Sequence, residues 1–382
     1  MAAKQPARFS KKQIPSLRYA MLHSDFGFRD GVSIVMQQVQ EVMINRLHIP
    51  KKNIFYLVGR SSRKDPRISK YNELHHSDKQ NLLMRQWFEQ GYGGDRSQRI
   101  ERAIDKAQKH IEDFVDEYKI DVIIAHNMSL PFNFIFAIAL HRFYRDRVQA
   151  HKPTPKYVLW WHDAHTERPF YAKPAPDVKR YLLQGVPGPF VEYIVFINSL
   201  QFNQAKEYFA DLDQLKPGYL EDISHNHSVA YNTTGTFIDS YEDIESDRFS
   251  SRVETFLHEF KVRDLLDSHS LSLTDVQFCL QHTRIVARKR IDFALEYCFA
   301  LFDKLKKKRS CKTEAFYFLI SGHDADKTKP KLKRLHKKLC KKYDTDKFFL
   351  VFAAEYDKKT SLKFEEYPLI FAKLKGLTTY FS

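Results

Sequence analysis

The sequence predicts an α/β protein with two mostly parallel sheets, and three observations support this prediction. At 382 residues, the chain is long enough for two hydrophobic cores. Short apolar runs alternate with segments of helical periodicity over residues 19–209, which is typical of a parallel sheet with helices on both faces. After an irregular stretch, the same alternation begins again at residue 276. We therefore expect two α/β domains.

The first alternation predicts the N-terminal sheet. Its longest apolar run is 132–140 (FNFIFAIAL), which is far shorter than the roughly 20 residues of a membrane span and predicts a buried helix. Residues 60–82 are polar and irregular, and we expect no regular element there. The predicted strands are 19–22, 53–58, 120–125, 157–161 and 193–196, and the predicted helices are 32–46, 98–118, 130–144 and 201–209.

The second alternation predicts a smaller C-terminal sheet. Residues 219–275 break the rhythm with many Ser and Asp residues and one helical stretch, 252–266. The predicted domains are therefore 1–235 and 276–382, with an interdomain connection at 236–275. The predicted strands are 276–280, 315–320, 348–352 and 377–381, and the predicted helices are 291–306, 331–342 and 367–373.

The charge of the chain favours an anionic partner. The formal net charge is +15, and much of it lies in two basic runs, 304–312 and 327–342. The plainer interpretation of the second run is a solvated helix face, and the alternative is peripheral attachment to anionic lipid head groups. Nucleic acid is an unlikely partner, because aromatic residues are not interleaved with the basic runs as a stacking platform requires.

The N-terminus and the cysteines indicate a cytoplasmic protein. The N-terminal residues are basic but contain no apolar core with a cleavage site, so we expect no signal peptide. Cys279, Cys298, Cys311 and Cys340 are scattered without the spacing of metal ligands, which fits a reducing compartment. Cys279 and Cys298 lie in apolar patterns and are expected in the core.

The segment 281–295 (QHTRIVARKRIDFAL) is the strongest functional signal. It places Arg284 and Lys289 between a predicted strand and a helix that begins near Ile291. A strand, a basic turn and a helix N-terminus suit a diphosphate: the helix dipole favours the anion, Arg offers two parallel donors and Lys adds a point charge. The cations and the helix end neutralise the phosphates, so we expect no metal.

Other predicted strands also end in polar or glycine residues, where open α/β sheets bind ligands. Gly31, which opens a helix, allows either a phosphate contact or a plain turn, and Gly322 leaves the same two alternatives. His126 and His162 also follow predicted strands, and each could be a general base, a donor to a sugar hydroxyl or a structural residue. His162, Asp163 and His165 lack a further metal ligand, which argues against a metal. The residues at strand ends are His126, Asn127, His162 and Asp163.

In their order, these segments resemble the retaining glycosyltransferases of the GT-B fold, in the large family-four group. Its donor domain opens with a strand and a pattern G-R-x-x-x-x-K-G-I-D, which resembles TRIVARKRID at 283–292. Arg284 and Lys289 match that pattern, whereas Thr283 and Arg290 replace its glycines. The resemblance implies two Rossmann-like domains facing a cleft, with Arg284 and Lys289 binding the diphosphate of a nucleotide sugar.

The N-terminal half resembles the same group. Residues 120–143 resemble the segment with His-Asn after a strand, and 157–171 the segment whose His-Asp begins the acceptor-side crevice. Residues 29–33 align with the helix-leading glycine loop, and VAYNTTG (229–235) with the interdomain turn. With the strand-end residues above, the candidate site residues are His162 and Asp163 for catalysis, Gly31 beside the donor phosphates, and His126, Asn127 and Gly322 in the cleft.

One departure concerns the C-terminus. In the family, the strand resembling 377–381 is followed by a Glu-Gly-Phe-Gly type loop that contacts the donor sugar, whereas this sequence ends at Ser382. The resemblance therefore implies a truncated C-terminal domain. The expected function is retaining sugar transfer from a nucleotide diphosphate sugar, which is a substrate rather than a cofactor, to a hydroxyl acceptor. The alternatives are a non-catalytic remnant of such an enzyme and a basic protein that binds nucleic acid or a membrane surface.

Overall fold

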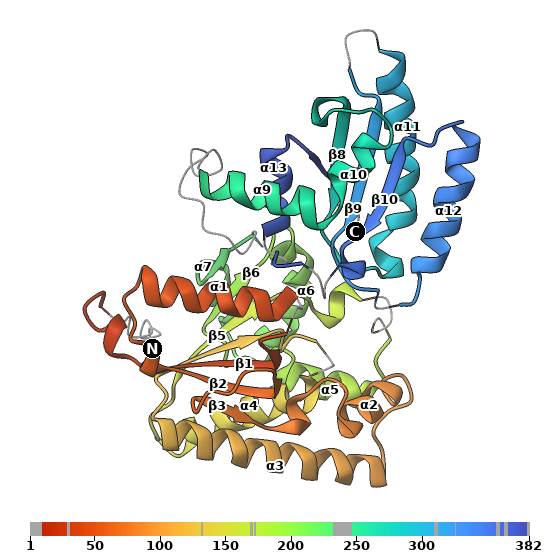
Figure 1. Cartoon of the computed structure of the whole chain (residues 1–382). Coiled ribbons are helices and arrows are strands. Elements are labelled where there is room, and N and C mark those ends of the chain that lie inside the picture. Colours follow the sequence, from red (N-terminus) through yellow and green to blue (C-terminus); the bar gives the residue numbers. More distant parts are fainter. Residues whose placement is uncertain are drawn as a thin grey trace. The chain divides into compact units, whose positions relative to one another are not determined.

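The computed structural model describes residues 10–28, 31–130, 133–168, 171, 173–231, 247–308, 312–324, 326–356, 360–362 and 366–379. The chain forms two compact units, unit 1 (Met1–Thr233) and unit 2 (Thr234–Ser382), each built around its own parallel sheet (Figure 1). The predicted α/β class with two parallel sheets is confirmed. Within the described part of the chain, each helix is too short or too polar to cross a membrane.

Unit 1 contains a seven-stranded parallel sheet with the strand order β3-β2-β1-β4-β5-β6-β7. The strand order reverses direction at β1 and β4, which are neighbours in the sheet. Ligands bind at such a switch point in open parallel sheets, beyond the carboxyl ends of the strands. The strands are β1 (Tyr19–Phe26), β2 (Ile54–Ser61), β3 (Ile68–Lys70), β4 (Val122–His126), β5 (Lys156–Trp161), β6 (Tyr193–Phe196) and β7 (His227–Val229).

The helices of unit 1 cover the two faces of this sheet unequally. Helix α1 packs on one face, while α3, α4, α5 and α6 contribute to the large buried cluster on the other (Figure 1). The helices are α1 (Gly31–Asn45), α2 (Lys79–Gln86), α3 (Asp95–Tyr118), α4 (Phe134–Gln149), α5 (Pro176–Gly185), α6 (Gln201–Asp213) and α7 (Tyr219–His225).

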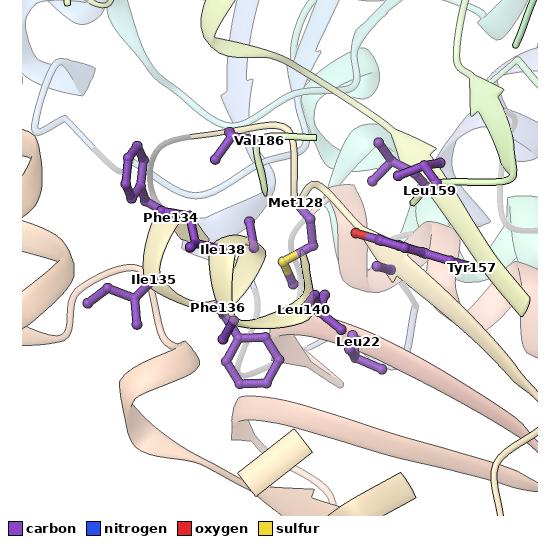
Figure 2. Packing of buried hydrophobic residues seen from close by; sticks show 14 of the residues in the cluster. Leu22, Met128, Phe134, Ile135, Phe136, Ile138, Leu140, Tyr157, Leu159 and Val186 are labelled. Carbon is purple, nitrogen blue, oxygen red and sulfur yellow. The ribbon is translucent and has the colours of Figure 1, made fainter. Parts of the chain in front are cut away.

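Helix α4 is the centre of the larger core. Residues 134–140 are all buried, as the apolar run predicted, because α4 lies against α3, α5 and the sheet. Figure 2 shows side chains of α4 beside Leu22 of β1 and Leu159 of β5. Gly185 of α5 permits the close approach of these two helices, since a Cβ atom there would lie 2.5 Å from the Cα of Ile138.

Unit 2 contains a four-stranded parallel sheet with the order β10-β9-β8-β11. Helices α11 and α12 pack on one face, and α9, α10 and α13 on the other. The strands are β8 (Val276–Gln281), β9 (Ala315–Ile320), β10 (Phe348–Phe352) and β11 (Leu377–Thr379); the helices are α9 (Asp247–Glu259), α10 (Val262–Asp267), α11 (Ile291–Lys307), α12 (Lys329–Lys342) and α13 (Tyr367–Lys373).

Two predicted segments differ from the structure. The helix expected at 252–266 is divided into α9 and α10 at Lys261, which has a positive φ of 53°. Both helices belong to unit 2 and bury Phe256, Leu257 and Leu266 in its core, although the sequence suggested a connection over 236–275. Residues 60–82 contain β3 and the start of α2, which were not expected. Residues 232–235 and 380–381 lie outside the described part of the chain.

Candidate functional site

The loop between β8 and α11, residues 282–290, carries both predicted phosphate-binding cations. Arg284 is exposed and Lys289 half-buried, and a short 3₁₀ helix at Ala287–Lys289 leads directly into α11. The carboxyl end of β8 and the amino end of α11 therefore place these cations at one edge of the sheet. Within the described residues, the Arg284 side chain forms no hydrogen bond or ion pair, which leaves its guanidinium available to an anion.

The β8–α11 loop is held against the loop that follows β9. The backbone N–H of Ile285 donates to the carbonyl of His323 (2.9 Å), and the N–H of Ala287 donates to Asp326 Oδ2 (3.0 Å). A Cβ atom on Gly322 would lie 2.2 Å from the carbonyl oxygen of Thr283 and 2.6 Å from the Cα of Arg284. Gly322 thus permits a close backbone approach, and the backbone that approaches it belongs to the cation-bearing loop itself.

A buried amide supports the start of the same loop. The Gln281 side chain, at the end of β8, donates from Nε2 to Thr283 Oγ1 (3.0 Å) and accepts at Oε1 from the hydroxyl of Thr379 in β11 (2.7 Å). Next to it, His282 Nδ1 and the Ser321 hydroxyl lie 2.9 Å apart, and burial lowers the pKa of His282 to about 4. These uncharged contacts connect β8 to its two neighbours, β9 and β11, at the start of the loop.

At one of the two positions where this sequence lacks a glycine of the family pattern, the backbone has angles that favour glycine. Arg290, where the pattern has glycine, adopts left-handed backbone angles (φ 42°, ψ 44°) immediately before α11. A non-glycine residue with left-handed backbone angles destabilises the folded state by about 1 kcal/mol, because its Cβ is crowded by the backbone. The side chain offsets little of this cost, since its ion pair with Asp292 (3.2 Å) is exposed.

We expect Arg290→Gly to stabilise unit 2 by about 0.5–1 kcal/mol, through relief of the left-handed strain. The measurement is thermal unfolding, with an increase of about 2–4 °C. Asp292→Asn removes the same ion pair without changing the backbone, so it serves as the control and is expected to leave the unfolding temperature nearly unchanged. A lower unfolding temperature for Arg290→Gly would contradict the assigned strain.

In unit 1, the structure brings three histidines together at the carboxyl edge of β1, β4 and β5. His126 Nδ1 lies 3.1 Å from His162 Nε2, and His23 Nδ1 donates to the backbone carbonyl of His126 (3.2 Å). The Trp160 ring stacks on His126 with centroids 5.4 Å apart. These contacts fix the orientation of His162, which follows β5 directly.

Burial keeps the imidazoles of His126 and His162 neutral. Desolvation lowers the pKa of His162 to about 3 and that of His126 well below its usual value, and neighbouring imidazoles add to both effects. A histidine with such a low pKa is a poor general base near pH 7. His162 is therefore better suited to hydrogen-bond a hydroxyl group than to remove its proton.

The remaining predicted residues of unit 1 have local structural partners. The Asp163 carboxylate forms an ion pair with Arg168 through two nitrogens, which neutralises its charge. Asn127 has a positive φ of 61°, and its carbonyl accepts from Asn133 Nδ2 (3.1 Å). Gly31 opens α1, and a Cβ atom there would meet no atom of the described residues within 4 Å. The packing of unit 1 therefore does not require glycine at this position.

Sequence reasoning missed a cluster around Asp25, at the end of β1. Within the described ranges, the one group of three side chains with metal-ligand spacing is Asp25, His75 and His76, whose ligand atoms lie within 4.8 Å of one another. However, the Ser77 N–H donates to His75 Nδ1 (3.2 Å), which places the proton of neutral His75 on Nε2, the atom facing Asp25. Arg60 also pairs with Asp25 (3.1 Å). A hydrogen-bonded carboxylate explains this cluster better than a metal site.

Together, the two parallel sheets and the basic strand–loop–helix segment of unit 2 define the class of this protein: it has the GT-B glycosyltransferase fold, as the sequence resemblance implied. No family model matches the sequence. Solved structures with a similar fold include a UDP-forming trehalose-phosphate synthase from Burkholderia xenovorans (TM-score 0.52, 10% identity, 94% of this chain and 76% of that one). Another is the N-terminal domain of trehalose-6-phosphate phosphatase from Candida albicans (TM-score 0.52, 12% identity, 97% and 77%).

A curated protein with a similar sequence is mannosylglucosylglycerate synthase from Petrotoga mobilis. The two sequences are 26% identical over 301 residues, which cover 76% of this chain and 58% of the relative. The chain thus spans somewhat more than half the length of this relative. A further solved structure, from E. coli, carries UDP-2-fluoro glucose (TM-score 0.50, 10% identity, 93% of this chain and 76% of that one).

Proposed function

We propose that this protein transfers a sugar from a nucleotide diphosphate sugar to a hydroxyl acceptor, with retention of configuration. The observation that carries the proposal is the β8–α11 loop, which presents Arg284 and Lys289 beside the amino end of α11. The similar structures described as UDP-forming or bound to a UDP sugar support a nucleoside diphosphate donor. Retention follows from the resemblance to the family-four group.

In this proposal, unit 2 binds the donor. The guanidinium of Arg284 donates to the diphosphate, Lys289 adds positive charge, and the first amides of α11 favour the anion. Negative charge develops on the diphosphate as the bond to the sugar breaks, so these groups stabilise the transition state more than the ground state. Gly322 acts indirectly, since it permits the packing that positions the loop.

We further propose that unit 1 serves the acceptor and the transferred sugar. His162 is fixed by His126 and is neutral, so it can donate to or accept from a sugar hydroxyl without carrying charge. Asp163 supports this segment through its pair with Arg168. The carboxyl edge of the sheet, with Gly31 and Asn127, is the proposed surrounding surface, and the buried His126 supports it from beneath.

We also propose that the protein works in the reducing cytoplasm. Cys279 and Cys298 lie 3.8 Å apart in the core as free thiols, and free thiols persist in a reducing compartment.

Calorimetric titration with UDP-glucose and GDP-mannose tests the donor site. We expect at least one of these sugar nucleotides to bind, and Arg284→Ala and Lys289→Ala each to weaken binding by about tenfold or more, as for charge-assisted hydrogen bonds. Arg290→Gln removes a neighbouring cation that pairs with Asp292 and serves as the matched control. Transfer with the wild-type protein, followed by NMR of the product anomer, tests retention.

The outcomes separate the alternatives. Equal binding by all variants would remove the roles of Arg284 and Lys289. Absence of binding at millimolar UDP-glucose and GDP-mannose would favour the non-catalytic remnant.

A further inference from the structure

A second group of cations lies at the opposite edge of the unit 2 sheet from the β8–α11 loop. Helices α11 and α12 each follow the carboxyl end of a strand and run back along the sheet, so their own carboxyl ends reach its amino edge (Figure 1). Lys304, Lys306 and Lys307 lie in the last turn of α11, and Lys341 and Lys342 in the last turn of α12. The proposed donor site uses none of them.

Helix α12 has a continuous basic surface. Leu332 and Leu339 are buried against the sheet, so the opposite side of the helix faces solvent. The sequence of α12, KPKLKRLHKKLCKK, contains no acidic residue. We define the α12 basic face as the exposed cations on the solvent side: Lys331, Arg334, Lys337, Lys338 and Lys341.

The protein itself does little to neutralise the α12 basic face. Glu355 pairs with Lys329 (2.6 Å) and Lys333 (2.8 Å), which flank the face. Across the described segments, the side chains of the face itself form no ion pair or hydrogen bond. Its members repeat at intervals of three and four residues, where like charges repel. The helix dipole favours Lys341 at the carboxyl end, but it does not explain Lys331 and Arg334.

We propose that the α12 basic face docks on an anionic membrane surface. Lysine predominates over arginine, and its compact charge attracts a diffuse anionic surface without the two-pronged geometry that suits individual phosphates or bases. The exposed large hydrophobic residues found in the structure do not include any of α12, so the face offers neither a platform for base stacking nor an anchor for deep insertion. Attachment is therefore electrostatic and reversible by salt.

Carboxylates near the carboxyl end of α12 limit the positive surface to the side of this helix. At the amino edge, Asp303 pairs with Lys307 (2.6 Å) and Glu314 with Lys347 (3.4 Å), and Asp344 and Asp346 follow α12. These carboxylates reduce the positive potential beyond the helix. Because the β8–α11 loop lies near the amino end of α12, whereas Arg334, Lys338 and Lys341 lie further along the helix toward the amino edge of the sheet, a change at these three residues is expected to separate binding of vesicles from binding of donor.

The test is sedimentation of the full chain with vesicles of phosphatidylcholine, with and without about 30% phosphatidylserine. In about 0.1 M salt, we expect binding to the anionic vesicles alone, with release in about 0.5 M salt as the charges are screened. The triple variant Arg334→Gln, Lys338→Gln, Lys341→Gln is expected to lower the partition coefficient at least tenfold and to bind UDP-glucose as the wild type does.

The matched control removes the same charge from unit 1, at the exposed Arg102, Lys79 and Lys109 (all to Gln), and is expected to keep vesicle binding. Equal loss in both triple variants would show that net charge alone, +15 for the chain, drives binding and would overturn the proposal. No binding of the wild type to anionic vesicles in about 0.1 M salt would also overturn it. So would tighter binding to duplex RNA or DNA that displaces the vesicles, which would identify nucleic acid as the partner.

Discussion

Gly322→Ala is expected to destabilise unit 2 by about 3 kcal/mol and to abolish donor binding. The added Cβ would lie 2.2 Å from the Thr283 carbonyl oxygen and 2.5 Å from its carbon. Both neighbours are backbone atoms, which cannot move aside as a flexible side chain would. The two loops must separate, and Arg284 is displaced with them. Urea unfolding and calorimetric titration with the sugar nucleotide that binds the wild type measure the two effects.

Gly93→Ala is the matched control, because a Cβ atom there meets no atom within 4 Å and its φ is not positive. Its stability is expected to equal or slightly exceed that of the wild type. Wild-type stability and donor binding in Gly322→Ala would show that the close approach at Thr283 does not position the loop.

Acidification from pH 7.5 to pH 5.5 is expected to destabilise unit 1 by about 4 kcal/mol. Burial lowers the pKa of His162 to about 3 and those of His141 and His165 to about 4. Each of these side chains takes up a proton near pH 6.5 in the unfolded chain but stays neutral in the folded one. Their contribution to stability is therefore complete above about pH 6.5 and is lost as the pH falls toward the folded pKa values.

Urea unfolding at several pH values between 7.5 and 5.5 measures this dependence. His141→Gln should reduce the number of protons taken up on unfolding by about one, which lowers the slope of stability against pH. His151→Gln, which removes an exposed imidazole, is the control measured at the same pH values. A free energy of unfolding that stays constant from pH 7.5 to 5.5 would show that the buried histidines are not held neutral.

Several elements of unit 2 were predictable from sequence. The strands at Ala315–Ile320 and Phe348–Phe352 and the helix at Tyr367–Lys373 have the predicted bounds, and each begins directly after a charged residue. The strand β3 was missed because it has only three residues and no buried side chain, and α2 because only two of its residues are buried. Short elements of this kind are determined by tertiary contacts rather than by local pattern.

The candidate site was only partly predictable. The position of Arg284 and Lys289 between a strand and a helix could be inferred, since the chain order alone places them at the carboxyl edge. The bond between His126 and His162 needed the neighbouring positions of β4 and β5. The role of Gly322 depends on a contact with Thr283, 39 positions earlier in the sequence, and no local pattern reveals such a contact. The Asp25 cluster joins the end of β1 to His75 and His76, which lie in a distant polar segment without clear periodicity.

The amide of Gln281 has a thermodynamic consequence. It bonds to Thr283 in the cation-bearing loop and to Thr379 in β11, an outer strand of the sheet. Two segments that share one partner are coupled, and such coupling is reciprocal. An anion that restrains the loop therefore also raises the free energy needed to detach β11, and a sequence change that loosens β11 weakens the anion's binding to the same extent.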